Sequence, residues 1–373
     1  MFSKRSLAIL AAVMLMLSAL LCPLLPAVRA EASADAAGGS YNANDLEKLL
    51  SFLEQSDKNG KKNGSKLNAG YDPALPETWC SPAEAGESGM NLPAILWREI
   101  EGEKRLVRLE LPFMCEFTGR LDLSDCAALE HLSFRDNRIS EVNLAGCRAL
   151  TSLIGYRNEL TCLDVSDCPL LETLAIQHNS VSSIDVSNNP MLSALCCDGN
   201  GIAALDLSGN PALTELRCEG NGLTRLELMH NPKLDRLWTV GNPLKELDLS
   251  GNEALIPSKL FASGEGSVGY YGNDGTHSVI AERHGGSEFV GWFDASGKCI
   301  STAASLRLDS TSPAELIAVF ASPGTTPAFP AERTGGGLSP LQLILPAALA
   351  GAAAAAAGML IARRMNKNGD ENR

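Results

Sequence analysis

LTELRCEGNGL, residues 213–223, contains the pattern that decides the fold, because it returns every 21 residues along the chain. Its asparagine belongs to a column with this spacing, made of Asn137, Asn158, Asn179, Asn200, Asn221 and Asn242. A leucine stands five residues before each asparagine, at Leu132, Leu153, Leu174, Leu195, Leu216 and Leu237. Six coils that keep these columns in step without an insertion predict a solenoid, in which each repeat buries its apolar side chains against its neighbours.

The repeat resembles the leucine-rich repeat family, whose frame is L-x-x-L-x-L-x-x-N-x-L. Residues 213–223 fit that frame with Cys218 in place of the third leucine. LTRLELMHN (223–231) nearly repeats LTELRCEGN (213–221), so each coil carries the half-motif twice. This doubling resembles the short nested repeats of bacterial members, which have no room for a helix on the far side. The resemblance implies a mainly β solenoid of stacked coils and leaves the function open, because function is grafted on the fold.

The asparagine column is interpreted as structural. Buried turn backbone must find hydrogen-bond partners, and an asparagine amide that points inward can supply them to neighbouring loops. All six asparagines are therefore expected to belong to the scaffold rather than to a ligand site.

The rest of the chain divides by composition. Lys4 and Arg5 precede an apolar run, which predicts a signal peptide, and an uncharged apolar segment followed by Arg363 and Arg364 predicts a transmembrane helix with a cytoplasmic tail. The expected organisation is a signal peptide at 1–30, a leader and N-terminal cap at 31–120, the solenoid at 121–255, a small β-module at 256–321, a Pro/Gly/Thr stalk linker at 322–340, the transmembrane helix at 341–362 and the tail at 363–373.

Two of these segments rest on resemblance as well as on pattern. Asn44 is expected to cap a helix with Glu47 in its first turn, and this helix with the tryptophans after it is similar to the N-terminal cap of leucine-rich repeat domains. EFVGWFDASGKCIS (288–301) with ELIAVF (315–320) resembles the β-module beside the repeats of internalin-type surface proteins.

The C-terminal region leaves two anchoring mechanisms open. The order ERTGG, apolar span, Arg-Arg is similar to the wall-sorting signals of Gram-positive surface proteins, but no L-P-x-T-G is present. Plain membrane anchorage is therefore expected in preference to covalent attachment to the wall.

Charge and motifs argue against several classes of function. Loss of Lys4, Arg5 and Arg29 with the signal peptide changes the net charge from −13 to −16, which disfavours nucleic-acid binding. No H-E-x-x-H, G-x-S-x-G or G-x-x-x-x-G-K motif occurs, so neither an enzyme nor a cofactor is expected. The cysteines show no zinc-site spacing. Cys197 and Cys218 are interpreted as small core residues, and Cys80 and Cys115 are the candidate disulfide pair.

An acidic column runs beside the leucines. A weak cation ladder would use Asp164, Asp185, Asp206 and Asp248, since like charges one coil apart raise carboxyl pKa values or recruit Ca²⁺. The alternative is that these carboxylates are solvated outer residues, each near a serine that bonds the turn. No other metal site is expected.

The expected partner surface is one face of the first strand of each coil, where side chains vary in type between coils. Its candidate residues are Arg135, Tyr156, Gln177, Asp198, Arg217, Glu219 and Trp238. Tyrosine, tryptophan and arginine are the types enriched in binding hot spots, although Trp238 could instead pack on the module that follows. The sequence thus predicts a non-enzymatic surface protein that binds an extracellular protein or glycan. The alternative is a structural envelope spacer without a dedicated ligand.

Overall fold

The computed structural model describes residues 40–79, 94–273, 276–309 and 311–322. Within those ranges no helix has both the length and the apolar character needed to cross a membrane. The expected signal peptide (1–30), transmembrane helix (341–362) and tail (363–373), nearly all of the stalk linker, and Cys80 of the candidate disulfide lie outside the described residues.

The N-terminal region contains the described helices and a strand pair. Its elements are β1 (Ser40–Tyr41), α2 (Ala43–Leu53), α3 (Asn63–Leu67), the 3-10 helix η1 (Pro76–Thr78), β2 (Ile95–Ile100) and β3 (Glu103–Glu110). The N-cap of α2 is Asn42, whose side chain accepts from the Asp45 N–H. The expectation that Asn44 caps this helix is wrong, because Asn44 lies inside α2 and donates its amide to the Ser124 carbonyl.

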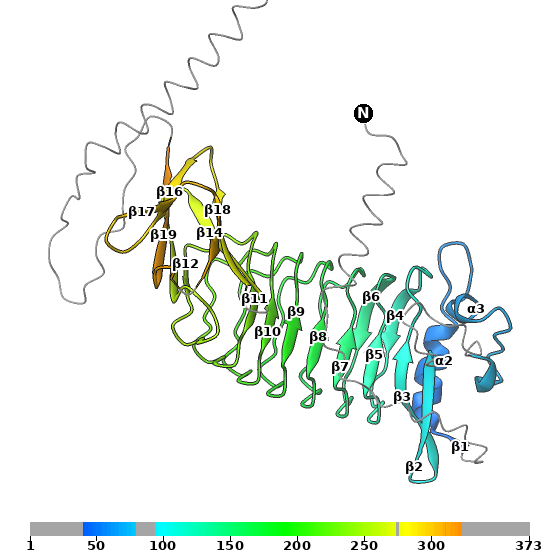
Figure 1. The fold of residues 1–373 in the computed structure, drawn as a ribbon. Helices are drawn as coiled ribbons and strands as arrows, with labels where there is room; N and C mark the ends of the chain where they lie inside the picture. The colour runs from blue at the N-terminus through cyan, green and yellow to red at the C-terminus, as the bar shows by residue number, and fades with distance from the viewer. Residues whose placement is uncertain (1–39, 80–93, 274–275, 310, 323–373) are drawn as a thin grey trace, which may run out of the picture. The chain divides into compact units, whose positions relative to one another are not determined.

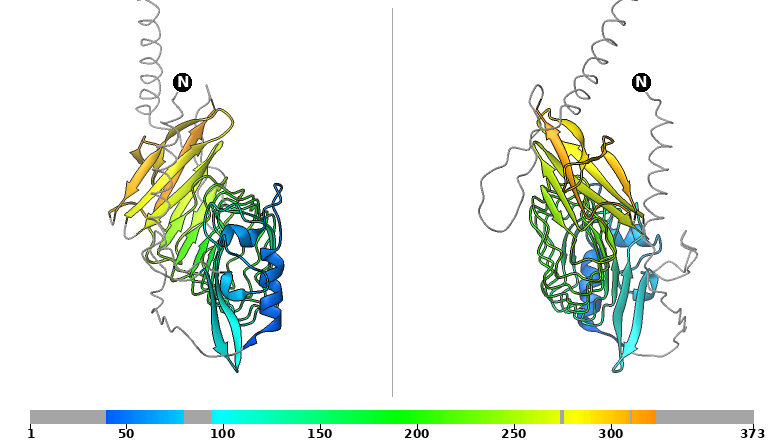
Figure 2. Two further views of the ribbon diagram at one scale, coloured as in Figure 1. Left: turned by 90° about the vertical axis from the view of Figure 1, so that its right-hand side faces the viewer. Right: turned by 60° about the vertical axis from the view of Figure 1, so that its left-hand side comes forward.

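Helix α2 packs against the first coils, as Figures 1 and 2 show at the blue end of the ribbon. Its apolar face is buried, and the Phe52 and Phe117 rings lie 6.2 Å apart. Asp45, fully buried, accepts from Arg105 Nε at 2.8 Å, and Lys48 pairs with Asp122 at 3.0 Å. Buried charge is tolerated at Asp45 because it is paired and hydrogen-bonded.

The solenoid is built around one parallel ladder of short strands, which Figure 1 shows as successive rungs. After β3 this ladder continues through β5 (His131–Ser133), β7 (Ser152–Ile154), β8 (Thr173–Ala175), β9 (Ala194–Cys196), β10 (Glu215–Arg217) and β11 (Arg236–Trp238). Each central leucine pairs in register with the next, as Leu153 does with Leu174, and all six are buried. The return halves of the coils contain no helix between 121 and 252, and near the ends of the solenoid they form β4 (Thr118–Asp122), β6 (Arg138–Asn143) and β12 (Glu246–Asp248).

Each asparagine of the 21-residue column bonds two coils together. The Nδ2 of Asn158 donates to Phe134 O of the previous coil at 2.8 Å and to Gly155 O of its own coil at 3.2 Å. Its Oδ1 accepts from the Ile139 N–H at 2.9 Å. Asn137, Asn179, Asn200, Asn221 and Asn242 make the same type of contacts.

A second ladder lies in the return turn and changes residue type along the solenoid. It begins as Cys126, Cys147 and Cys168 and continues at the same spacing as Asn189, Asn210, Asn231 and Asn252, all essentially buried. The Cys147 thiol donates to Leu123 O at 3.1 Å, and burial raises its pKa. Asn189 instead donates to two carbonyls of the preceding coil, Val165 O at 2.9 Å and Cys168 O at 2.8 Å.

The residues after the solenoid form a β-module that extends its ladder. The module strands are β13 (Lys259–Ser263), β14 (Gly266–Asn273), β15 (Thr276–Arg283), β16 (Glu288–Phe293), β17 (Cys299–Ser301), β18 (Ser305–Leu308) and β19 (Glu315–Ala321). Strand β14 pairs antiparallel with β11, so Trp238 stands opposite Tyr271. A second sheet, in the order β12-β13-β19-β16-β17, joins the last coil to the module.

The second ladder generates a stability prediction. Asn189→Ala removes two buried hydrogen bonds and leaves Val165 O and Cys168 O with only the backbone N–H donors of Cys168 and Leu171, so the free energy of unfolding should fall by about 1–3 kcal/mol. Asn188→Ala, at the exposed neighbouring position, is the matched control and should change it by less than about 0.5 kcal/mol. Urea denaturation measures both, and equal effects would contradict a bonding role for the ladder.

Candidate functional site

The strand face consists of three columns of side chains that flank the inward leucines of β5 to β11. Strand alternation places residues before and after an inward leucine on one face. The column before the leucine is His131, Ser152, Thr173, Ala194, Glu215 and Arg236. The column after it is Ser133, Ile154, Ala175, Cys196, Arg217 and Trp238, and the third is Arg135, Tyr156, Gln177, Asp198, Glu219 and Val240.

All seven residues that the sequence singled out lie on this face, on successive coils. The column that contains Glu215 and Arg236 was missed, although the two-residue period of a strand would have found it. These two residues form a buried ion pair, with Arg236 Nη1 3.2 Å from Glu215 Oε2.

The C-terminal half of the strand face is occupied by contacts within the chain. Arg217 Nε lies 3.4 Å from Asp198 Oδ2, and its guanidinium stacks over the Trp238 ring with Cζ 5.0 Å from the centroid. Trp238 meets Tyr271 of β14 edge-on at 5.7 Å and is only 3% exposed. Of the two alternatives for Trp238, an exposed partner-binding residue or packing on the module that follows, packing on the module is confirmed, because β14 pairs with β11 and covers the indole.

Glu282 of β15 closes the backbone ladder at this end. In the earlier coils the N–H at this turn donates to a carbonyl of the following coil, as Gly220 N does to Val240 O at 2.8 Å. The Gly241 N–H instead donates to the Glu282 carboxylate, whose two oxygens lie 3.0 and 3.1 Å from the Gly241 nitrogen. The Glu282 side chain of the module therefore accepts the hydrogen bond that a backbone carbonyl of the following coil accepts in the earlier coils.

Burial raises the pKa of several carboxyl groups in this half of the face. It raises the pKa of Asp198, where Arg217 opposes the shift, and that of Glu215, where Arg236 does so. Burial, together with the charges of Asp198 and Glu282, raises the pKa of Glu219 from 4.5 to about 7. This region is therefore the acidic, proton-sensitive half of the strand face.

The N-terminal half of the strand face is more open. An arginine–aromatic row crosses three neighbouring segments of the ladder: Phe113 after β3, Arg135 after β5 and Tyr156 after β7. The Arg135 Cζ lies 5.5 Å from the Phe113 centroid, and Arg135 Nη1 donates to the Tyr156 hydroxyl at 3.1 Å. Phe113 is 40% exposed and the adjacent Met114 is 65% exposed, so this part of the face presents apolar surface to solvent.

The acidic column is a series of turn-bonding carboxylates. Asp164, Asp185, Asp206 and Asp248 each accept from the N–H two residues ahead at 2.9 Å, and all four are exposed. Hydrogen bonds from Ser187 and Ser208, chiefly from their backbone N–H groups, lower the pKa of Asp185 and Asp206. At Asp185 these serine bonds outweigh the repulsion from Asp206, in agreement with the alternative of solvated carboxylates near a serine that bonds the turn.

No group of three or more His, Cys, Asp or Glu side chains is placed to hold a metal ion in the described part of the chain. Weak cation binding by the acidic column stays a prediction.

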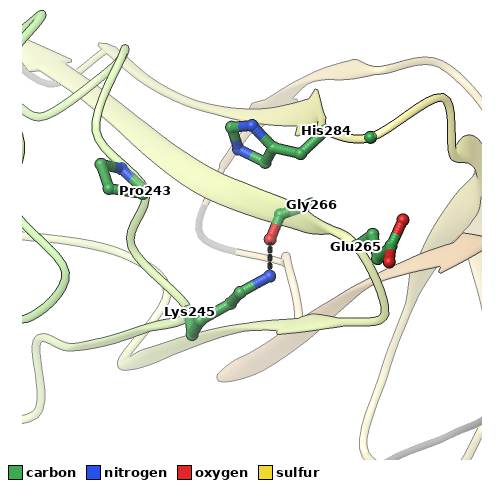
Figure 3. Close-up of a pocket in the computed structure, with 6 residues that line it drawn as sticks. Pro243, Lys245, Glu265, Gly266 and His284 are labelled. Carbon is green, nitrogen blue, oxygen red and sulfur yellow. Dashed lines mark hydrogen bonds between the residues drawn. The ribbon is translucent and has the colours of Figure 1, made fainter.

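A cavity of about 300 Å³ lies where the last coil meets the module. Figure 3 shows Pro243 and Lys245 on one side and Glu265, Gly266 and His284 on the other. The Lys245 ammonium donates to the carbonyls of Gly264 and Gly266, and His284 Nε2 is 2.8 Å from Ser267 Oγ. Its polar groups bond neighbouring elements, so the cavity belongs to the packing of the junction.

The solved structures similar to this chain include proteins of Listeria monocytogenes and Leptospira interrogans. The functional domain of InlJ from Listeria monocytogenes, which includes a cysteine ladder, is 29% identical over 43% of this chain and 39% of that one, with a TM-score of 0.32. The internalin InlF from Listeria monocytogenes is 21% identical over 38% of this chain and 46% of that one, with a TM-score of 0.32. A leucine-rich repeat protein of Leptospira interrogans is 17% identical over 39% of this chain and 55% of that one, with a TM-score of 0.29.

The chain spans between 39% and 55% of the length of these structures. No protein-family model and no curated protein matches the sequence. The solenoid architecture of the chain rests on its own 21-residue register and in-register leucine ladder.

The raised pKa of Glu219 predicts a pH dependence of stability. The native state holds this proton more tightly than the unfolded chain, so the free energy of unfolding should fall as pH rises from about 4.5 to about 7. Glu219→Gln removes the ionisation, so its melting temperature should exceed that of the wild type at pH 8, with the gain shrinking toward pH 5. Thermal melts across this range measure it, and Glu227→Gln on the exposed return half is the control. A wild-type slope that persists in Glu219→Gln would contradict the assignment.

Proposed function

We propose that this chain is a non-enzymatic binding protein of the cell surface, in which the strand face recognises an extracellular protein or glycan. The single observation that carries the proposal is the arginine–aromatic row with Met114, in which Phe113 and Met114 stay exposed beside a guanidinium that contacts two aromatic residues. Tyrosine and arginine are residue types enriched in binding hot spots, and clustered exposed apolar side chains mark interaction sites.

The binding surface is proposed at the N-terminal half of the face. Of the seven candidate residues, Arg135, Tyr156 and Gln177 lie on the first three coils, and the described module strand that joins the ladder pairs with β11 at its other end. Asp198, Arg217, Glu219 and Trp238 lie in the half that is joined to the module, where Asp198 and Arg217 pair and Trp238 is covered. The latter are proposed to shape the acidic end of the surface rather than to serve as anchors.

Secretion by the segment 1–30 and anchoring by the segment 341–362 belong to the same proposal. Both rest on the sequence pattern of charged and apolar residues. With the tail inside, the repeats would face the exterior, where an extracellular partner is reachable.

The alternative is an envelope spacer without a dedicated ligand. The experiment that separates the two uses the full-length chain as bait against extracts of host and bacterial surfaces. Phe113→Ala with Tyr156→Ala should lower the affinity for the captured partner about 30-fold, the effect of losing about 2 kcal/mol at a hot spot.

The matched control is Leu170→Ala with Met229→Ala. It also removes two large exposed apolar side chains, but from turns outside the strand face. Capture by the wild type and the control but not by the Phe113/Tyr156 variant supports the proposal. Identical capture profiles for all three folded baits would favour the spacer.

A further inference from the structure

Arg135 differs from the other arginines of the strand face and its margin in having no carboxylate partner within the part of the chain that the structure describes. Each of the others has a carboxylate oxygen within 4.0 Å: Arg108 with Glu110, Arg157 with Asp136, Arg217 with Asp198 and Arg236 with Glu215. Among the described residues, the polar side-chain contact of Arg135 is with the uncharged Tyr156 hydroxyl, and its second contact is with the Phe113 ring. Its charge is therefore held in place by two aromatic residues without being neutralised.

A guanidinium fixed in this way is suited to an anionic group of a partner. Its planar fork binds a carboxylate through charge-assisted hydrogen bonds, and part of its conformational freedom is already restricted by the two rings. Ordering such a side chain before binding reduces the entropy that association must overcome. The chemistry of Arg135 thus points to a carboxylate in the partner.

The surroundings of Arg135 favour a protein over a glycan as the source of that carboxylate. Sugars bind aromatic residues through an open ring face, but the guanidinium of Arg135 lies over the Phe113 ring. The exposed Met114 beside it offers a flexible apolar side chain, which adapts to irregular protein surfaces. An acidic residue next to an apolar one would fit both groups.

The charge of the face also sets where such a segment would lie. Asp198 and Glu219 lie in the third column on the later coils, and Glu215 lies in the column before the leucine, while Arg135 occupies the third column of the first coil. Arg217 and Arg236 pair with Asp198 and Glu215, so Glu219 is the one of these carboxylates whose repulsion would keep an acidic segment at the N-terminal end, because like charges across an interface disfavour misplaced binding.

We propose that the arginine–aromatic row binds an exposed protein segment in which an Asp or Glu is next to a large apolar residue. Arg135 pairs with the carboxylate, and Phe113 and Met114 receive the apolar side chain. This inference rests on the proposed function, because it names the partner chemistry for the same strand face.

The test uses full-length protein and two bead-bound decapeptide pools, identical except for a central Leu-Glu-Leu or Leu-Gln-Leu. The wild type should be retained about tenfold more strongly on the glutamate pool, the preference expected of a charge-assisted hydrogen bond. Arg135→Ala should lose that preference. Arg138→Ala removes an exposed arginine from β6 of the same coil, where it pairs with Glu116 at 3.1 Å, and should keep it.

A third set of beads carries a uronic-acid oligosaccharide. Retention there that depends on Arg135 and exceeds that on the glutamate pool would overturn the choice of protein over glycan. Equal retention of the wild type on both peptide pools, or an unchanged preference in Arg135→Ala, would overturn the role of Arg135. In either case capture that is still lost in the Phe113/Tyr156 variant would leave the proposed function standing, so the two failures are distinguishable.

Discussion

The structure depends on the asparagine side chain that bonds one coil to the next. A turn inside a solenoid has backbone groups that water cannot reach, and these must be paired. Each asparagine of the column from Asn137 to Asn242 meets that requirement for a donor and an acceptor alike, because its amide donates to a carbonyl of the preceding coil while its oxygen accepts from an N–H there, as Asn179 does with Gly155 O and Leu160 N. An insertion of a single residue would displace the amide from both partners. This constraint explains why the 21-residue spacing is kept through six coils.

Because the ladders and the leucines hold the coils together, the strand face is free to differ between coils. The two halves of that face have different uses. At the C-terminal half, Trp238, Arg217 and Asp198 join the last coils to a module whose Glu282 completes the backbone ladder at Gly241. At the N-terminal half, the Arg135 side chain contacts the aromatic residues Phe113 and Tyr156, and no described carboxylate pairs with it. Its positive charge is therefore available to a partner. The open half is where we place recognition, and the acidic half limits which partners fit.

The register made the solenoid, its inward leucines and the position of the strand face predictable, because all three follow from a period. The continuation of the cysteine column as Asn189, Asn210, Asn231 and Asn252 was missed, although the same spacing contains it. Other features depend on contacts that no period contains. The burial of Trp238 requires β14 to pair with β11, and the cap at Asn42 depends on which of two nearby asparagines reaches the Asp45 N–H. The contrast between Arg135 and Arg217 was equally hidden, since it depends on whether a carboxylate of a neighbouring coil lies within reach.

The central claim is that asparagine amides, rather than apolar packing alone, hold each coil in register. The most direct measurement is hydrogen exchange, followed by mass spectrometry, on peptides that contain Leu160 in the wild type and in Asn179→Ala. Faster exchange is expected at Leu160, whose N–H donates to Asn179 Oδ1 at 3.0 Å, with little change in the distant coil that contains Leu223. Unchanged protection at Leu160 in the variant would mean that packing suffices without the amide, and would contradict the account.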